Sequence, residues 1–353
     1  MNLQMPSEKR PIYIIGAGGI VNEAHLPAYQ IAGFNVQGIF DIDLAKATAT
    51  ANKFSIPEVF PGLDEMIAGA PSNALFDVAV PGSQMIPILK QLPSNAVVLL
   101  QKPMGENFEQ AKQILYLVRE KKQLAAINFQ LRYAPYILAA KKLISENQLG
   151  ELNDIEINVN VYTPWHLWEF LVATSRVEIL YHSIHYIDLI RNLLGNPVSV
   201  YAKTTRHPST PQLASVRSNI IMDYGDFIRA NILTNHCHNY GMSRQQSYIK
   251  IEGSKGAVLI NFGALINYPR GAVDSFEYVF LKDGEDPQWK KMEIEGSWFP
   301  HAFIGSMAQL MLAAEGSIGR PDNSVEDCIY TMACTEAAYL SSEQGGVLLP
   351  PIS

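Results

Sequence analysis

The sequence predicts an α/β fold followed by an α+β fold, on three observations. From residue 12 to residue 129, apolar runs of strand length alternate with stretches of helical periodicity, the order that builds a parallel, doubly wound Rossmann sheet. After about residue 133, strand-like runs follow one another across short turns, which favours a mostly antiparallel sheet accompanied by helices. The length of 353 residues suits two domains. We expect these domains to span residues 1–130 and 131–353, and the last helices can pack back on the first domain.

In the first domain, the expected elements place particular residues at one edge of the sheet. Strands are predicted over residues 12–15, 34–40, 75–80, 96–100 and 125–129, and helices over 20–31, 44–54, 63–68, 85–91 and 106–121. Ligands of doubly wound sheets bind beyond the carboxyl ends of the strands. The residues at such ends are Gly16, Asp41, Pro81, Lys102 and Asn128.

In the second domain, strands predominate. They are predicted over residues 155–162, 198–204, 218–222, 227–234, 248–252, 257–261 and 276–281. Helices are predicted over 135–146, 177–194, 303–315 and 325–344. Gly195 and Pro197 stop the helix 177–194, because neither residue continues a helix well.

The turn Gly16-Ala17-Gly18-Gly19 joins the first strand to the first helix. Gly16 permits a tight turn, and Gly18 has no side chain to keep a pyrophosphate from the backbone. The helix that follows, from Ile20 onward, offers unpaired N–H groups and the positive end of its dipole to that phosphate. The turn therefore predicts a dinucleotide site, although glycines alone can also mark an ordinary strand-to-helix turn.

An acidic residue follows this turn at the spacing that dinucleotide-binding chains use. Asp41 ends the second strand and would accept hydrogen bonds from the ribose hydroxyls of the nucleotide. Its charge would repel a 2′-phosphate, so NAD is favoured over NADP as the cofactor. Asp43 is the alternative acid if the strand ends later. Val21 departs from the pattern, because a small residue usually occupies the third glycine position.

Composition excludes several classes of protein. Apolar residues make up 48% of the chain, enough to bury a sizeable core, so a disordered chain is not expected. The net charge is −7 and there is no Lys/Arg cluster, so nucleic acid and anionic membranes are not expected partners. No stretch reaches the roughly 18 apolar residues of a membrane span. The chain has three cysteines, Cys237, Cys328 and Cys334, without C-x-x-C spacing. We therefore expect a cytoplasmic protein in which all three cysteines are packing residues.

Two stretches carry side chains suited to catalysis. Lys102 follows a buried strand at the ligand edge, where it can hydrogen-bond a substrate hydroxyl and favour its alkoxide, although most lysines are only solvated. On the helix 177–194, α-helical spacing places Tyr181, His185 and Asp188 on one face and His182 near His185. A histidine suits proton transfer near neutral pH, and a pair of core histidines is the competing interpretation.

Metal and aromatic sites are weaker alternatives. His182 with His185 and Asp188, or His236 with His238, could hold a metal, but neither spacing is distinctive and we expect none. Aromatic residues that could stack on a sugar cluster in expected loops, although core packing is their usual role. They are Tyr162, Trp165, Trp168, Trp298, Phe299 and Phe303.

Several stretches together resemble the Gfo/Idh/MocA family of oxidoreductases (glucose–fructose oxidoreductase, inositol dehydrogenase and MocA-like proteins). They are Gly16-Ala17-Gly18-Gly19-Ile20, Ala24-His25-Leu26-Pro27-Ala28, Gln101-Lys102-Pro103, Asn128-Phe129-Gln130-Leu131-Arg132-Tyr133, His185-Tyr186-Ile187-Asp188, Ser324-Val325-Glu326-Asp327, and Glu336-Ala337-Ala338-Tyr339 with Ser342. The resemblance covers essentially the whole chain. It implies NAD(P)-dependent oxidation or reduction of sugar or cyclitol hydroxyls, by a Rossmann domain plus an open sheet whose face commonly builds dimers or tetramers.

The residue patterns and the resemblance together assign residues to roles. Lys102, His185, Tyr181 and His182 are expected in catalysis, and Asn128, Arg132, Trp165 and Trp168 at the substrate. The cofactor residues are expected to be Gly16, Gly18, Gly19, Ile20, Asp41, Pro81, Gln101 and Lys102.

Two positions depart from the family pattern. Gln101 stands where the family usually has Glu, and Tyr181 where it usually has the Asp of its catalytic set. An unperturbed tyrosine has a pKa of about 10 and accepts no proton readily near pH 7. The proton must then go to an imidazole, to Lys102 or to water, and we favour His185. These departures also motivate a second class of function, a nicotinamide-binding sensor or regulator without turnover.

Overall fold

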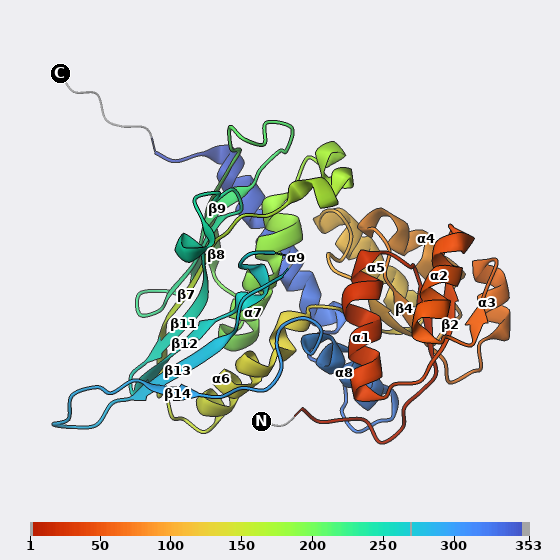
Figure 1. Ribbon diagram of the computed structural model, residues 1–353, viewed down its shortest axis with the longest axis horizontal. Coiled ribbons are helices and arrows are strands. Elements are labelled where there is room, and N and C mark those ends of the chain that lie inside the picture. Colours follow the sequence, from red (N-terminus) through yellow and green to blue (C-terminus); the bar gives the residue numbers. More distant parts are fainter. Residues whose placement is uncertain (1–2, 269, 348–353) are drawn as a thin grey trace. The chain divides into compact units, whose positions relative to one another are not determined.

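The computed structural model describes residues 3–268 and 270–347 (Figure 1). The chain divides into two compact units, Met1–Lys142 with Ile294–Met332 (unit 1) and Leu143–Glu293 with Ala333–Ser353 (unit 2). Helices α6 (Pro135–Ser145) and α9 (Val325–Gln344) contain residues of both units. Each unit is described by itself.

Unit 1 is built on a six-stranded parallel sheet. The strands are β1 (Ile12–Ile15), β2 (Val36–Phe40), β3 (Glu58–Val59), β4 (Leu75–Val78), β5 (Val97–Leu100) and β6 (Leu124–Ile127). Their order is β3-β2-β1-β4-β5-β6, and every pair is parallel. This arrangement confirms the predicted doubly wound Rossmann sheet. The central strands β1, β4 and β5 are buried at every residue, as expected where helices cover both faces of a parallel sheet.

Unit 1 contains helices with and without a side-chain cap at the first turn. They are α1 (Leu26–Ala32), α2 (Leu44–Phe54), α3 (Leu63–Gly69), α4 (Met85–Gln91), α5 (Phe108–Glu120) and α8 (Ala302–Ala314), with a π-helical turn at Val21–His25 before α1. The side chain of Asp43 accepts hydrogen bonds at the start of α2, and that of Asn107 does so at the start of α5. The predicted helices thus occur, with ends shifted by at most two residues in α2, α3, α4 and α5.

Helix α8 comes from late in the sequence but belongs to the core of unit 1. It is apolar on nearly all sides, which is typical of a buried helix. Met307, Ala308 and Met311 join the core cluster that includes Ile12 and Leu99. Helices α1 and α8 lie side by side (Figure 1).

Unit 2 holds an eight-stranded mixed sheet. The strands are β7 (Leu152–Asn160), β8 (Ser199–Thr205), β9 (Arg217–Asp223), β10 (Arg229–Asn235), β11 (Gln246–Gly253), β12 (Gly256–Asn261), β13 (Ser275–Phe280) and β14 (Lys290–Met292), in the order β14-β13-β12-β11-β7-β10-β9-β8. Six of the seven pairs are antiparallel, and β7 pairs with β10 in parallel. The parallel pair was not predicted, because β8, β9 and a helix separate β7 from β10 in the sequence and no local pattern shows which distant strands pair.

Helix α7 (Ile184–Leu194) of unit 2 lies beside the sheet (Figure 1). It packs against β10 and follows a π-helical turn at Ile179–Ser183. In β9, Ser218, Ile220 and Met222 are buried while the residues between them are exposed, so one face of the strand is covered. Arg176 donates two hydrogen bonds to the Glu336 carboxylate and lies 4.7 Å above the Tyr339 ring, which ties α9 to the segment before α7.

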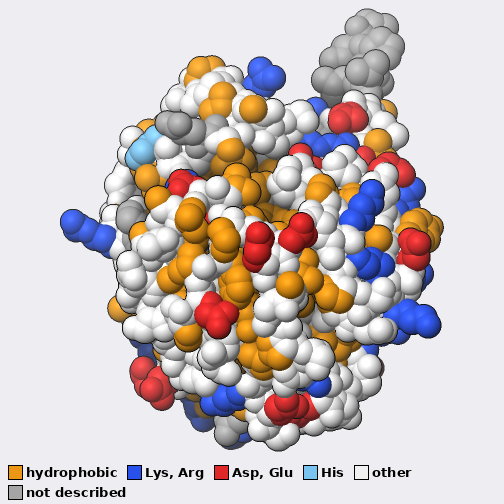
Figure 2. Space-filling model, turned by 90° about the vertical axis from the view of Figure 1, so that its right-hand side faces the viewer, with side chains coloured by type: hydrophobic (Ala, Val, Ile, Leu, Met, Phe, Trp, Pro, Cys, Tyr) orange, Lys and Arg blue, Asp and Glu red, His pale blue; other side chains and the backbone are white. Residues whose placement is uncertain are grey.

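The distribution of surface charge and the burial of the cysteines agree with what the composition predicts. On the face drawn in Figure 2, acidic and basic side chains are interspersed among the described atoms. Cys237, Cys328 and Cys334 are reduced and buried, which confirms their predicted role in packing. Among the residues described, no helix combines the length and the apolar character needed to cross a bilayer.

The contact between α8 and Tyr133 generates a stability prediction. A Cβ on Gly305 would lie 2.4 Å from the Cβ of Tyr133, both in unit 1. Overpacking costs about 1–3 kcal/mol, against a helix-propensity gain of about 1 kcal/mol for alanine. Gly305→Ala should therefore lower the thermal unfolding midpoint. Gly319→Ala is the matched control, because a Cβ there meets nothing within 4 Å, and an equal loss in both variants would contradict the prediction.

Candidate functional site

The turn after β1 has a backbone that only glycine can adopt. Gly16 has a φ of +111°, and a Cβ there would lie 2.4 Å from the carbonyl oxygen of Ala79. Gly18 and Gly19 are exposed, and a Cβ on either would meet nothing within 4 Å. Helical structure begins at Gly19, so the first unpaired N–H groups of the helix lie beside this open space. The turn is thus shaped to receive an anionic group.

The first helical turn accommodates the residue that departs from the glycine pattern. Val21 is fully buried and begins the π-helical stretch Val21–His25. A π turn contains one residue more than an α turn. Val21 therefore lies in a turn that departs from α-helical geometry.

Asp41 lies directly beside the glycine turn. Its Oδ2 accepts a hydrogen bond from the Ala17 N–H at 2.7 Å, and its Oδ1 accepts one from the Asp43 N–H at 2.8 Å. Asp43 instead caps α2, where its side chain accepts from the N–H groups of Ala45 and Lys46. Of the two acids considered in the sequence, Asp41 is therefore the one held at the turn.

The ends of β4 and β5 carry three further predicted residues. Pro81 is exposed and precedes a short helical turn, Gly82–Gln84. Gln101 is buried, and Lys102 is half-buried. Desolvation lowers the pKa of the Lys102 amine to about 8. An amine with that pKa can gain or lose a proton near neutral pH, which a solvated lysine cannot readily do.

Asn128, at the end of β6, belongs to a buried hydrogen-bond network that the sequence did not reveal. Its Nδ2 donates to Gln101 Oε1 at 3.0 Å and lies 3.2 Å from His25 Nε2. His25 Nδ1 and the Tyr29 hydroxyl each lie 2.7 Å from Asp77 Oδ2. All five residues are in unit 1 and at most 8% exposed. The signal was a histidine four residues from a tyrosine on a buried helix face, which by itself is common in cores.

Of the predicted residues in unit 2, Tyr181 and His182 lie in the π-helical turn before α7. The Tyr181 ring lies 5.7 Å from the Phe170 ring, and the His182 ring lies 4.4 Å from the His236 ring. His185 follows in α7 and is buried. The sequence prediction of a common face for Tyr181 and His185 assumed α-helical spacing, which a π turn alters. π turns occur frequently at functional sites.

A buried carboxylate lies beneath this turn and was also missed. Glu178 accepts hydrogen bonds from the Ser183 and Ser218 hydroxyls, and its Oε1 lies 3.4 Å from His236 Nε2. Burial opposes its charge, but hydrogen bonds from His236, Ser218 and Ser183 prevail and hold the pKa of the carboxyl below its ordinary value. The network fixes the start of the helical segment that carries the predicted catalytic residues of unit 2.

The residues predicted to bind substrate differ in their burial and in their contacts. Trp165 is buried with its ring edge-on to the rings of His182 and His236, and Trp168 is half-buried against Tyr268. Arg132 is 1% exposed and donates to the Asp322 carbonyl and the Asp327 carboxylate, so it joins the segment before α9 to the first turn of that helix. The expected loop aromatics Trp298 and Phe303 are core residues, with Phe303 packed on His25.

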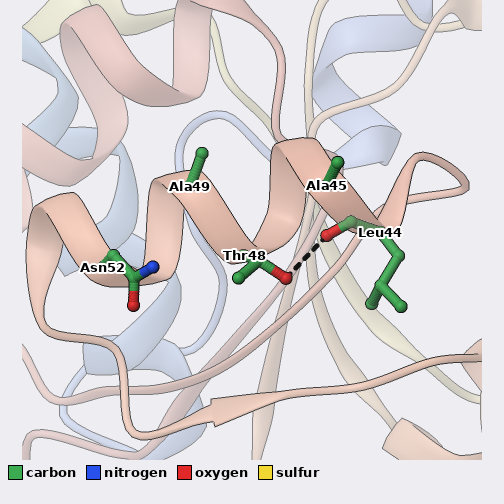
Figure 3. A pocket seen from close by; sticks show the side chains of 5 residues that line it. All are labelled: Leu44, Ala45, Thr48, Ala49 and Asn52. Atoms are coloured by element: carbon green, nitrogen blue, oxygen red, sulfur yellow. Dashed lines mark hydrogen bonds between the residues drawn. The ribbon is translucent and has the colours of Figure 1, made fainter.

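A surface depression of about 610 Å³ lies elsewhere, beside α2 (Figure 3). Its lining comes from one helix, and the Thr48 hydroxyl donates back to the Leu44 carbonyl. The lining residues are Leu44, Ala45, Thr48, Ala49 and Asn52. None of these five lining residues is charged, so we place the candidate site at the edge of the sheet instead.

Comparison with protein-family models identifies the chain. Residues 11–129 match the oxidoreductase family with an NAD-binding Rossmann fold, and residues 137–259 match the GFO/IDH/MocA C-terminal domain. The chain belongs to the Gfo/Idh/MocA family. Its parallel sheet, glycine turn and Asp41 are thus parts of an NAD-binding type of Rossmann domain.

The proteins to which this chain is similar include dehydrogenases and a regulatory protein. The chain is 29% identical over 248 residues to glucose-6-phosphate 3-dehydrogenase of Bacillus subtilis, a match covering 65% of this chain and 68% of that protein. It is 26% identical to the galactose/lactose metabolism regulatory protein GAL80 of Saccharomyces cerevisiae, covering 58% of this chain and 48% of that protein. Several of the curated Gfo/Idh/MocA relatives are matched over only half of their length or less.

Solved structures share the fold over nearly the whole chain. An oxidoreductase from Agrobacterium radiobacter, in complex with NAD+, L-tartaric acid and magnesium, superposes with a TM-score of 0.78 at 18% identity. The match covers 96% of this chain and 98% of that one. At this identity the likeness concerns the Gfo/Idh/MocA fold alone.

The open glycine turn generates a binding prediction. Gly18→Ala should fold normally, because a Cβ at Gly18 meets nothing within 4 Å, yet the methyl group would occupy the space of a bound pyrophosphate. We expect NAD+ affinity to fall by roughly tenfold or more, about 1.4 kcal/mol. Isothermal titration calorimetry would measure it, with Gly319→Ala as control. Undiminished affinity in Gly18→Ala would place the nucleotide away from this turn.

Proposed function

We propose that this protein is an NAD-dependent dehydrogenase that transfers hydride between nicotinamide and a hydroxyl or carbonyl group of a sugar, cyclitol or related polyol. The observation that supports it best is the glycine turn. Its backbone requires glycine at position 16, where φ is +111°, and Gly18 faces open space beside Asp41. The family model that matches this part of the chain describes an NAD-binding Rossmann fold. Names of relatives such as glucose-6-phosphate 3-dehydrogenase support the substrate class.

Within residues 1–130, the nucleotide would be held at the glycine turn. Backbone N–H groups near Gly18, Gly19 and Ile20 would receive the pyrophosphate. The Asp41 carboxylate would accept from the ribose hydroxyls, and Pro81 and Gln101 line the same edge of the sheet. When bound, NAD+ supplies the hydride acceptor. Because Asp41 is negatively charged where NADP carries a phosphate, NAD is the proposed cofactor.

The chain itself would handle the proton and the charge that develops on the substrate oxygen. Lys102, as an ammonium ion, would donate a hydrogen bond to the reacting hydroxyl and stabilise the alkoxide as hydride leaves. His185 would accept the proton, with His182 in a secondary role. Tyr181 would position the substrate, since a phenol is a poor base near pH 7.

Substrate recognition would rest mainly on residues 131–353. Trp165 and Trp168 carry apolar ring faces of the kind that stack on sugars. Asn128 would contribute from the sheet edge, whereas Arg132 is committed to Asp322 and Asp327 and is left out of the proposal. A cytoplasmic homodimer or homotetramer remains our proposal for the working form.

The second candidate is a regulator that binds nicotinamide nucleotide without turnover. The similarity to GAL80 supports it, together with Gln101 and Tyr181 at positions where the family usually has acids. A spectrophotometric screen of NADH formation over sugars, cyclitols and sugar acids separates the two. Turnover of any of them supports the dehydrogenase, and nucleotide binding without turnover across the set would favour the regulator.

Cofactor choice is tested at Asp41. The unaltered chain should bind NAD+ more tightly than NADP+, because the carboxylate repels the 2′-phosphate. Asp41→Ser should narrow the difference by roughly tenfold or reverse it, which titration of both nucleotides would measure. Asp43→Ser is the control, since Asp43 caps α2. Equal affinities for the two nucleotides in the unaltered chain would remove the basis of the assignment.

Proton transfer is tested by pH. The pKa of Lys102 is lowered to about 8, so the stabilising ammonium form is present below that pH and is lost above it. The rate of oxidation should therefore fall as pH rises through about 8. It should rise with pH through the single ionisation in which the His185 imidazole loses its proton and becomes a base. The profile of kcat/KM should be bell-shaped.

The variants assign the two limbs of that profile. His185→Asn should remove the rising limb and lower kcat, and Lys102→Ala should lower kcat by roughly 10²–10⁴ with NAD+ binding nearly intact. Tyr181→Phe should act mostly on KM. A threefold effect or less in Lys102→Ala, or an unchanged profile in His185→Asn, would return those side chains to structural roles.

A further inference from the structure

A buried chain of hydrogen bonds runs through unit 1 from Asp77 through His25 and Asn128 to Gln101, and we call it the relay. We propose that the relay fixes the orientation of the Gln101 amide, so that its Nε2 amino group, and not its carbonyl oxygen, is presented at the ligand edge beside Lys102. Asp77, His25 and Asn128 are then positioning residues. The identity of the ligand as a nicotinamide nucleotide or polyol rests on the proposed function, whereas the orientation itself does not.

The direction of the relay is set at its buried end. Asp77 is 0% exposed, and its Oδ2 lies 2.7 Å from both the Tyr29 hydroxyl and His25 Nδ1. Burial, followed by the charge of Asp77, raises the pKa of Tyr29 well above its ordinary value, so the phenol keeps its proton and donates it. A carboxylate oxygen only accepts, so His25 carries a hydrogen on Nδ1.

His25 passes this direction to Asn128. His25 is proposed to be the neutral imidazole with Nδ1–H, in which Nε2 has a lone pair and accepts a hydrogen bond. Asn128 Nδ2 lies 3.2 Å from it and donates. The reversed amide would set the Asn128 oxygen lone pairs against the Nε2 lone pair, which is repulsive. The network therefore fixes the amide of Asn128, an assignment that carbon, nitrogen and oxygen positions alone leave open.

Asn128 then fixes Gln101. The second hydrogen on Asn128 Nδ2 is donated to Gln101 Oε1 at 3.0 Å. With the oxygen used in this way, the Nε2 group of Gln101 is left for a ligand, and no other hydrogen bond of its side chain occurs within residues 3–268 and 270–347. Gln101 directly follows β5, so its Nε2 group offers a hydrogen-bond donor at this strand end. The ligand atom that meets Gln101 should be an acceptor, such as a carbonyl, carboxylate or hydroxyl oxygen.

The orientation can be tested without any ligand. In the full chain labelled with ¹⁵N at histidine, asparagine and glutamine, NMR should show His25 with a hydrogen on Nδ1 and none on Nε2. The amide hydrogens of Asn128 should show contacts to the His25 ring. A hydrogen on Nε2 would overturn the proposal, because Asn128 would then present oxygen and the Gln101 amide would be reversed.

The effect on binding is tested by a double-mutant cycle with NAD+ as the probe. Asn128→Leu and Gln101→Leu should each weaken binding by roughly tenfold, and the double variant should be no weaker than either within about threefold, since both remove the same oriented amide. Additive losses would overturn the positioning role.

The control is Gln123→Leu, which removes a buried amide of unit 1 that donates to the Leu89 and Pro93 carbonyls outside the relay. It should leave NAD+ affinity unchanged. A variant that carries both Gln123→Leu and Gln101→Leu should therefore bind NAD+ as weakly as Gln101→Leu alone. If the unaltered chain binds no NAD+, the proposed function fails while the NMR result still decides the relay. If Asn128→Leu does not fold, the tautomer of His25 in the unaltered chain remains the deciding measurement.

Discussion

The close approach of the Gly16 backbone to the Ala79 carbonyl is the constraint on which the ligand edge of unit 1 depends. β1 and β4 are paired neighbours, and the chain must leave β1 without touching the carbonyl that follows β4. Only a residue without a Cβ, at a φ of +111°, makes that exit. The turn then brings the Ala17 N–H to Asp41 and starts the helix at Gly19, so the positions that we propose for phosphate and ribose depend on this one backbone contact.

Both units hold the candidate residues in place with a buried carboxylate. In unit 1, Asp77 orders His25, Asn128 and Gln101 beneath the strand end that carries Lys102. In unit 2, Glu178 fixes Ser183 and pairs with His236 beneath the π turn that carries His182. Buried carboxylates are costly unless their oxygens accept hydrogen bonds, so each orders the donors around it. This ordering suits residues that must meet a ligand with a fixed donor or acceptor.

The spacing of apolar residues and glycines in the sequence predicted much of the fold and some of the candidate site residues. The alternation of apolar runs and helical stretches predicted the sheet of unit 1, because burial on both faces demands continuous apolar strands. Asp41 was predicted from its distance to the glycines. The face shared by Tyr181 and His185 could not be predicted reliably, because a π turn at Ile179–Ser183 leaves no mark on the apolar pattern. The parallel pairing of β7 and β10 was equally hidden.

The sequence by itself determined which residues end the strands of unit 1, and hence that Gly16, Asp41, Lys102 and Asn128 share one edge. That follows from local rules, since strand length and turn residues act over a few neighbours. Only the tertiary structure decided what those side chains do there. Arg132 is committed to Asp322 and Asp327, and Asn128 joins a relay that begins at Asp77. Hydrogen-bond partners so distant along the chain are chosen by packing, and no local pattern encodes them.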